Sequence, residues 1–371
     1  MTERLTIVPE YDRLFIPGPV GVRPEVLEAQ VGALMGHRTP EAEALMQRIQ
    51  PGLRAVFRTE RPVYVAPSSG TGMMEMGIRN AARRRVLSLV NGAFSERFAR
   101  IAAANGLEVD RLEVDWGENH TPQMVAEALR GKDYDTVTVV HSETSTGVLN
   151  PVREIAGVVH AAGDLMLLVD TVSSMAGAPV ECDAWGLDYV LTGSQKALAV
   201  PPGLGLAVAQ PGLLERAAAK KDRGYYFDLL AFEKNIEKNQ TPNTPAMTLM
   251  YALAVQAERI AAEGIEARWR HHRDMAARTY AWVDEMQALG VDVSVLAPEG
   301  YRSPTVSCIV LPEGRTGPDV CAAVRERAGY VIAPGYGKTP QRGLGAAGRG
   351  TLPGGADGSR PGGRPRATPL R

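Results

Sequence analysis

The sequence predicts an α/β fold in which a large domain with a mainly parallel seven-stranded sheet precedes a smaller α+β domain. Short apolar runs alternate with helix-length segments through the first two-thirds of the 371 residues, which is the pattern of βαβ units. The run LMLLVD is apolar up to its last residue, as expected of a central strand that is buried on both faces. After about residue 210 longer amphipathic segments follow, and they predict the second domain.

The expected elements follow from this alternation. Strands are expected at residues 62–66, 85–90, 108–113, 136–140, 165–170, 188–192 and 205–209, with helices at 71–83, 95–105, 122–130 and 153–162. In the C-terminal part we expect helices at 247–263, 265–289 and 317–328 and strands at 305–311 and 330–332. Within the first 40 residues only 24–33 show a helical pattern.

These elements divide the chain into an N-terminal arm (1–20), a large domain (21–245), a small domain (246–338) and a tail (339–371). The tail is rich in Gly, Pro and Arg and contains no Ile, Val, Phe, Tyr, Trp or Met, so we expect neither a regular strand nor a packed helix there. A natural disordered tail is one explanation. We favour a change of reading frame, because the composition changes abruptly within a domain.

Composition and charge exclude several classes of protein. The formal net charge of −1 gives no reason to expect nucleic acid or an acidic membrane surface as a partner. Cys182, Cys308 and Cys321 form no CxxC pair, which favours buried thiols in a reducing cytoplasm. The charged N-terminus is unlike a signal peptide, and no apolar run is long enough to span a membrane. We therefore expect a cytoplasmic protein.

Lys196 follows a predicted strand, inside the turn sequence GSQKAL. A lysine just beyond a strand end reaches the crevice at the carboxyl edge of an open α/β sheet, where ligands bind. Such a place suits a lysine that forms a Schiff base with an aldehyde, since the attacking amine must be neutral. The alternative is an ordinary surface lysine in a turn.

Asp170 ends the run LMLLVD, at the end of another predicted strand. A carboxylate at this point is costly unless it has a partner. The pyridinium nitrogen of pyridoxal phosphate would be such a partner, because an ionised Asp keeps that nitrogen protonated and the ring able to accept electrons. The alternative is an Asp that caps the next turn through Thr171 and Ser173. The pair of Asp170 and Lys196 favours the cofactor.

The stretch PSSGTGMMEMGIRN places small residues between a strand and an amphipathic helix. The N–H groups of Gly70, Thr71 and Gly72, with the helix dipole, would form an anion site suited to a phosphate monoester. The motif is not GxGxxG and lacks the lysine of a P-loop, so nucleotide binding is the weaker alternative. A plain helix cap at Ser69 or Thr71 is the other.

Six motifs occur in the order IPGPVGV, GHR, SSGTGMMEM, HSETSTGVLNP, VDTVSS and GSQKALAVPPGLG. Together they resemble the class V aminotransferases, in particular the serine–glyoxylate and alanine–glyoxylate branch, over roughly residues 13–338. The resemblance implies the architecture of fold-type I pyridoxal-phosphate enzymes, a Schiff base at Lys196 and a homodimer with composite active sites.

The resemblance also implies a role for each matching residue. His141 is expected to be structural, Phe94 is alternatively a core aromatic, and Thr244 is alternatively a helix cap. The cofactor contacts implied are those of the phosphate with Ser69, Gly70, Thr71 and Gln195, of the ring with Phe94, Val172 and Asp170, of the phenolic oxygen with Thr144, and of the other subunit's phosphate with Asn243 and Thr244.

The implied reaction moves an amino group from a small amino acid, serine or alanine, to a keto acid, glyoxylate or pyruvate, with Lys196 as general base and acid. The family's RIGHxG motif, whose arginine binds the substrate carboxylate, does not follow APGYGK here, so its role is not transferred to Arg342 or Arg349.

Alternatives stay open within and beyond this chemistry. A phosphoserine or 2-aminoethylphosphonate aminotransferase and a lyase would use the same cofactor. A desulfurase would need a cysteine on a mobile loop, whereas Cys308 and Cys321 fall in a predicted strand and helix. A non-catalytic protein that binds pyridoxal phosphate is the alternative of another class.

Overall fold

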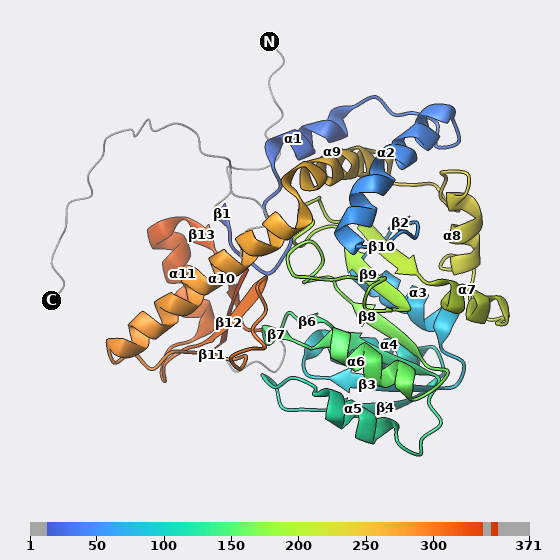
Figure 1. Cartoon of the computed structure of the whole chain (residues 1–371). Helices are drawn as coiled ribbons and strands as arrows, with labels where there is room; N and C mark the ends of the chain where they lie inside the picture. The colour runs from blue at the N-terminus through green and yellow to red at the C-terminus, as the bar shows by residue number, and fades with distance from the viewer. Residues whose placement is uncertain (1–12, 337–342, 348–371) are drawn as a thin grey trace, which may run out of the picture.

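The computed structural model describes residues 13–336 and 343–347, and its largest element is a seven-stranded sheet (Figure 1). The strand order is β2-β10-β9-β8-β5-β3-β4, and β10 runs antiparallel to both neighbours while the other pairs are parallel. The predicted mainly parallel sheet is confirmed. Its strands are β2 (Tyr64–Pro67), β3 (Arg85–Val90), β4 (Glu108–Glu113), β5 (Thr136–Val140), β8 (Met166–Asp170), β9 (Tyr189–Gly193) and β10 (Leu204–Ala209).

Helices cover both faces of this sheet because the chain crosses it in both directions. α4 (Ala93–Ala104) connects β3 with β4, whereas α6 (Val152–Ala161) leads from β5 to β8, in the opposite direction along the sheet. Right-handed crossovers therefore place these two helices on opposite faces. α3 (Gly70–Ala81) packs beside α4, and α5 (Pro122–Leu129) packs beside α6. The direction changes between β3 and β5, which is where an open α/β sheet forms its binding crevice.

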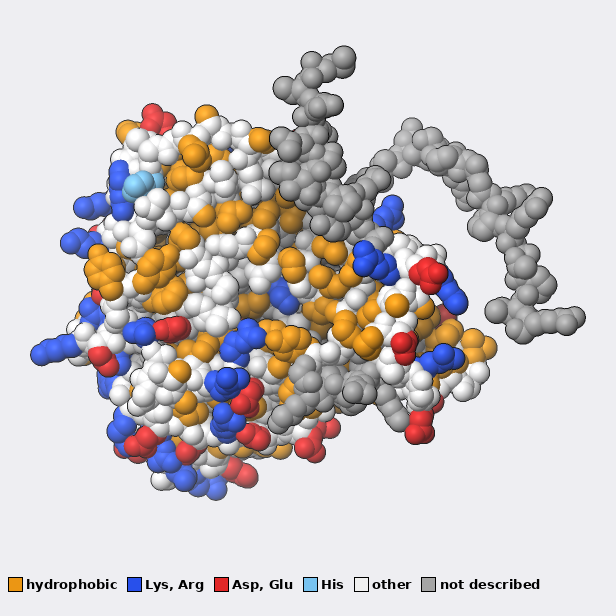
Figure 2. All heavy atoms as spheres, turned by 180° about the vertical axis from the view of Figure 1, so that it is seen from behind, with side chains coloured by type: hydrophobic (Ala, Val, Ile, Leu, Met, Phe, Trp, Pro, Cys, Tyr) orange, Lys and Arg blue, Asp and Glu red, His pale blue; other side chains and the backbone are white. Residues whose placement is uncertain are grey.

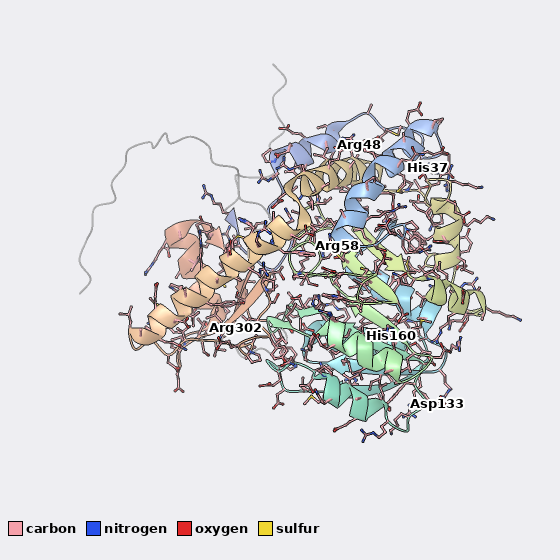
Figure 3. The ribbon with its side chains drawn as sticks, in the orientation of Figure 1. His37, Arg48, Arg58, Asp133, His160 and Arg302 are labelled. Carbon is pink, nitrogen blue, oxygen red and sulfur yellow. The ribbon has the colours of Figure 1, made fainter. Side chains whose placement is uncertain are left out.

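Further helices flank the sheet. The sequence pattern does not predict α2 (Pro40–Phe57), whose interior contains Pro51. α2 packs along α9 (Met247–Glu263), and an ion pair between Arg48, which Figure 3 labels on α2, and Glu258 joins the two helices. None of the helices within the described ranges is long and apolar enough to cross a membrane. The remaining elements here are α1 (Pro24–Glu28), η1 (Ala29–Val31), α7 (Pro211–Ala218) and α8 (Leu229–Ile236).

A second, antiparallel sheet has the order β11-β12-β15-β14. α10 (Ile265–Ala288) and α11 (Gly317–Ala328) pack against it, as the 3.6-residue pattern of these segments predicts. The short β1 pairs in parallel with β13, so the N-terminal arm joins this part of the molecule. The strands are β1 (Arg13–Leu14), β11 (Ser294–Val295), β12 (Val306–Val310), β13 (Tyr330–Val331), β14 (Ala333–Pro334) and β15 (Gly343–Ala347).

Strand β15 lies in the segment for which the sequence predicts no regular structure. Residues from Thr339 onward were predicted to lack a regular strand, yet Gly343–Ala347 pairs with β12 on one side and β14 on the other. The prediction is wrong for this segment because a strand between two partners needs only backbone N–H and C=O groups, and small residues do not hinder that pairing. The rest of the predicted tail, with Arg342 and Arg349, lies outside the described residues.

Candidate active site

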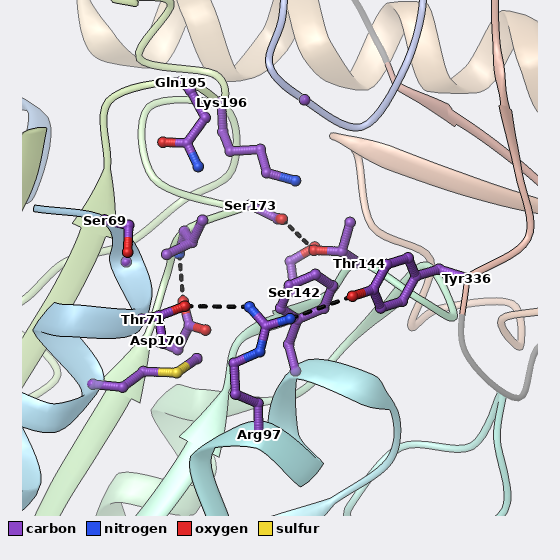
Figure 4. A pocket seen from close by; sticks show the side chains of 15 residues that line it. Ser69, Thr71, Arg97, Ser142, Thr144, Asp170, Ser173, Gln195, Lys196 and Tyr336 are labelled. Carbon is purple, nitrogen blue, oxygen red and sulfur yellow. Dashed lines mark hydrogen bonds between the residues drawn. The ribbon is translucent and has the colours of Figure 1, made fainter. Parts of the chain in front are cut away.

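The carboxyl ends of five strands deliver side chains to one cavity of about 340 Å³ (Figure 4). β2, β3, β5, β8 and β9 point the same way in the sheet, so the residues that follow them meet at one edge. Nine of the residues predicted from the sequence line this cavity: Ser69, Gly70, Thr71, Phe94, Thr144, Asp170, Val172, Gln195 and Lys196.

Lys196 lies two residues beyond Ser194, in the tight turn after β9, and its amine reaches into the cavity (Figure 4). Burial lowers the pKa of the Lys196 amine to about 8, against the opposing pull of the Asp170 and Glu143 carboxylates. The neutral amine is therefore available near physiological pH. Gly18 of the N-terminal arm faces the lysine, and a Cβ there would lie 2.6 Å from Lys196 Cδ. The φ of Gly18 is +144°, a region that favours glycine, and a larger residue there would push the lysine side chain aside.

Two buried donors hold the turn that carries the lysine. Arg268 of α10 donates from Nη2 to the Ala197 carbonyl at 2.6 Å, and Gln256 of α9 donates from Nε2 to the Leu198 carbonyl at 2.9 Å. Arg268 is also paired with Glu263 at 2.8 Å. Because an unsatisfied carbonyl inside a protein is costly, these bonds fix the backbone next to Lys196.

Asp170 is the last residue of β8 and is only 2% exposed. Burial raises the pKa of its carboxyl group to about 7, although the Val172 N–H donates to Oδ1 at 2.7 Å and favours the charged form. The neighbouring Glu143 raises this pKa further, and Lys196 and Arg97 lower it. A buried carboxyl with one hydrogen bond can still accept a cationic N–H donor.

The N-terminus of α3 lies at the cavity wall. As in any helix, the N–H groups of its first turn, those of Gly70, Thr71 and Gly72, have no intrahelical acceptor, and no side chain caps them. The helix dipole acts in the same direction. A side chain at position 70 would collide with Val172 Cγ2. This helix end is therefore an anion site in which the backbone comes close to its ligand.

Phe94 is the second residue of α4, which follows β3. The buried Glu143 carboxylate accepts from the Phe94 N–H at 3.2 Å and from the Ser95 N–H at 2.9 Å, so it fixes the start of the helix. The Phe94 ring stacks on Tyr336, with ring centroids 5.5 Å apart and 20° between planes. Lys196 Nζ lies 6.0 Å from the Phe94 centroid.

The hairpin after β5, formed by β6 (Ser142–Glu143) and β7 (Val148–Leu149), carries Thr144. The hydroxyls of Thr144 and Ser173 lie 2.5 Å apart at the cavity. His141, in contrast, is buried, contacts Ser174 Oγ at 3.0 Å and does not line the cavity. Burial lowers the pKa of His141 to about 4, which fits a neutral structural residue.

Asn243 and Thr244 do not line the cavity. They lie between α8 and α9, and Thr244 is exposed. α9 begins at Met247 with Ala246 at the N-cap position, so the alternative that Thr244 caps this helix is wrong. Their predicted contact with a second subunit stays a prediction. None of the three cysteines lines the cavity either.

Sequence reasoning missed six of the lining residues. Gly18, Met74, Ser142 and Ser173 stand inside motifs that carry the family resemblance, but none of them was assigned to the cofactor or the substrate. Arg97 lies three residues after Phe94, a spacing that puts both on one face of α4. Met74 lies three residues after Thr71, so these two residues share one face of α3. Tyr336 had no local signal, since it arrives from the region of the second sheet. All six are seen in the cavity lining: Gly18, Met74, Arg97, Ser142, Ser173 and Tyr336.

Known proteins share this fold and sequence. The chain is 41% identical over 327 residues to an uncharacterized aminotransferase of Methanocaldococcus jannaschii, covering 87% of this chain and 83% of the relative. It is 32% identical over 318 residues to a serine–glyoxylate aminotransferase of Methylorubrum extorquens, covering 82% and 78%. The crystal structure of an alanine–glyoxylate aminotransferase from Nostoc sp. superposes with a TM-score of 0.86 at 28% identity, covering 93% of each chain.

The sequence pattern of the family described as aminotransferase class-V matches residues 27–333. This match spans the strand ends, the α3 N-terminus and the lysine turn that form the cavity. The chain belongs to the class V aminotransferase family.

Proposed function

We propose that this protein is a pyridoxal-phosphate-dependent transaminase that moves the amino group of a small amino acid, serine or alanine, to a keto acid, glyoxylate or pyruvate. The observation that carries the proposal is the placement of Lys196 and Asp170 at the ends of adjacent parallel strands, facing one cavity. A neutral amine and a buried carboxyl in this arrangement suit a cofactor with an aldehyde and a basic ring nitrogen.

The cavity fits pyridoxal phosphate. The uncapped start of α3, with Ser69, Gly70 and Thr71, would hold the phosphate together with Gln195. Phe94 and Val172 would pack on the ring, and Thr144 would bond its phenolic oxygen. Asp170, buried with one hydrogen bond to Val172, would gain the ring nitrogen as its cationic partner. Pyridoxal phosphate supplies an aldehyde that combines with amines and a ring that accepts the electron pair from Cα.

Lys196 would move the proton in this reaction. Its amine is neutral above a pKa of about 8, so near neutral pH a useful fraction can take the proton from the substrate Cα and return it to the cofactor side. Asp170 would hold the ring nitrogen in its charged form. The hydrogen bonds from Arg268 and Gln256 keep the lysine turn in place while the amine moves.

The size of the cavity favours a small donor, because about 340 Å³ has to hold the cofactor together with the amino acid. The names of the serine–glyoxylate and alanine–glyoxylate relatives support the same choice. We further propose a homodimer in which Asn243 and Thr244 contact the partner's phosphate. Large exposed side chains, Val31 at 84% and Leu34 at 74%, support a buried interface, and Figure 2 shows further hydrophobic side chains across the middle of one face.

A spectrophotometric screen tests the function. Protein loaded with pyridoxal phosphate is mixed with each of the twenty amino acids, phosphoserine and 2-aminoethylphosphonate, and the cofactor absorbance is followed. We expect the fastest change with serine or alanine. Borohydride treatment should then attach the cofactor to the peptide that contains Lys196 in the parent protein and in a Lys221→Ala control. Attachment to another lysine, or stoichiometric cofactor with no reaction of any donor, would refute the proposal.

A further inference from the structure

Two cationic side chains line the cavity in the described part of the chain, Lys196 and Arg97. Arg97 sits on α4 one turn after Phe94, and its guanidinium lies 4.7 Å from the centroid of the Phe94 ring. Nη1 donates to Thr71 Oγ1 at 3.2 Å, and Nη2 donates to the Tyr336 hydroxyl at 3.3 Å (Figure 4). The side chain is thus fixed from the α3 side and from the second sheet.

The hydrogen-bond partners of Arg97 are neutral hydroxyl groups. Other arginines near the sheet pair with carboxylates, as Arg111 does with Glu96 at 3.0 Å and Arg79 with Glu75 at 2.7 Å. Within the described residues no carboxylate forms an ion pair with Arg97, and its contacts are two hydroxyls and an aromatic face. A guanidinium has five N–H donors, and the two hydroxyls use two of them. The remaining donors match a bidentate oxyanion.

Arg97 and Lys196 line the same cavity, and both lie near the ring of Phe94. Both cations are measured from the same Phe94 ring, at 4.7 Å for the guanidinium carbon and 6.0 Å for Nζ. An α-amino acid carries its amino group and its carboxylate on one carbon. A substrate whose amino group reacts in the cavity lined by Lys196 would therefore bring a carboxylate into the space that Arg97 also lines. A phosphate would have the backbone N–H groups and the dipole at the start of α3, where Arg97 also donates to Thr71 Oγ1, so the phosphate is the competing oxyanion.

We propose that Arg97, positioned by Tyr336, binds the carboxylate of the amino acid substrate. The inference rests on the proposed function and adds a residue that selects α-amino acids over simple amines. The same guanidinium chemistry would also suit the cofactor phosphate, so the experiment separates the two sources of negative charge.

The first arm measures the reaction of the loaded enzyme. Arg97→Met should raise the half-saturating concentration of serine by about 30-fold, the usual worth of charge-assisted hydrogen bonds. Its reaction with 2-aminoethanol, which lacks the carboxylate, should stay within about twofold. Arg97→Lys should recover part of the loss, and Tyr336→Phe should show a smaller loss of the same kind. Arg100→Met, which removes an exposed arginine one turn along α4, serves as the matched control.

The second arm measures binding without reaction. Calorimetry with propionate should give clear binding to the loaded parent protein and to Arg100→Met, and at least tenfold weaker binding to Arg97→Met. The affinity of cofactor-free protein for pyridoxal phosphate should change by less than about threefold in Arg97→Met. Thermal unfolding and the Arg97→Lys variant show whether a loss is a folding defect.

Each outcome decides the matter. A fall in cofactor affinity with unchanged propionate binding would assign Arg97 to the phosphate and overturn the proposal. Equal losses of the reactions with serine and with 2-aminoethanol in Arg97→Met would also overturn the proposal. So would a parent protein that binds no propionate. The same holds if Arg342→Met or Arg349→Met, and not Arg97→Met, loses serine affinity. If the parent binds propionate through Arg97 but no amino acid reacts, the transaminase function fails while the carboxylate site stands.

Discussion

The two sheets of this molecule differ in how their cores are built. In the seven-stranded sheet, β5, β8, β9 and β10 are buried along their whole length, and one continuous core joins them to the surrounding helices. Among the described side chains, which do not include those of β15, the four-stranded sheet rests on a core of Val283, Val293, Ile309 and Leu311. A solvent-facing hollow of about 480 Å³, with Trp282 on its rim, lies beside that core.

We infer that the two sheets have different roles in the active site. The large sheet fixes the strand ends at which Lys196 and Asp170 stand, and close packing on both faces keeps these groups in place. Tyr336, two residues after β14, reaches the same cavity from the side of the second sheet. We infer that the second sheet adapts the cavity to the substrate, whereas the large sheet supplies the chemistry.

Core truncations in the two sheets should differ most. Leu168 is fully buried in the middle of β8, so Leu168→Ala should lower the free energy of unfolding by about 4 kcal/mol. Ile309→Ala should cost about 2 kcal/mol, because the surroundings of Ile309 can relax into the neighbouring hollow. Urea unfolding of both variants measures this. Equal costs would show that the two cores are packed alike.

Asp170→Asn tests whether the chemistry belongs to the large sheet. An amide cannot keep the ring nitrogen of the cofactor charged, so turnover should fall about 10²-fold while cofactor binding persists. Asp133→Asn, at an exposed carboxylate, is the control. Turnover is compared at saturating donor, and near-normal turnover in the Asp170 variant would mean that this residue is only a structural cap.

The pH dependence of stability should also come from the large-sheet edge. In cofactor-free protein the raised pKa of Asp170, about 7, means that the folded state binds more protons than the unfolded state above pH 4, so stability falls as pH rises toward 7. The lowered pKa of Lys196, about 8, means that the unfolded state binds more protons above pH 8, so stability rises again toward pH 10.

Urea midpoints between pH 4 and 10 would reveal this minimum. Asp170→Asn should flatten the acid side and Lys196→Met the alkaline side. A profile that both variants leave unchanged would contradict the assignment.

The smallest effect is expected at the hollow of the second sheet. Trp282 is 46% exposed there, so Trp282→Ser should lower the free energy of unfolding by about 1 kcal/mol, because only part of its apolar surface is buried. A calorimetric melt suffices to check it. A cost comparable with that of Ile309→Ala would mean that the hollow is part of the core.

Sequence reasoning worked where a signal is local. Strand boundaries in the large sheet agree with the predictions to within about two residues, because apolar runs and their flanking turns are contiguous in the chain. The residues of the lysine turn and of the α3 start were found for the same reason, since each belongs to one short motif. Helices α9 and α11 have the predicted bounds.

Sequence reasoning failed for contacts between residues that are far apart in the sequence. Tyr336 reaches Arg97 across 239 residues, and no pattern around either residue announces that contact. Arg268 supports Ala197 from 71 residues away, on a helix whose face otherwise looks ordinary. The strand at Gly343–Ala347 was missed because its composition lacks β-formers, and only its two partners determine its conformation.

The position of β15 between β12 and β14 has a consequence for the solubility of the chain. A chain cut before Gly343 would leave the N–H and C=O groups of Val306–Val310 unpaired along that side of β12. An open strand edge of this kind recruits other chains through backbone hydrogen bonds. The truncated protein would keep Lys196, Asp170 and the α3 start, yet it would be prone to aggregate. A short run of glycine, leucine and alanine thus shields the apolar strand VSCIV from intermolecular pairing.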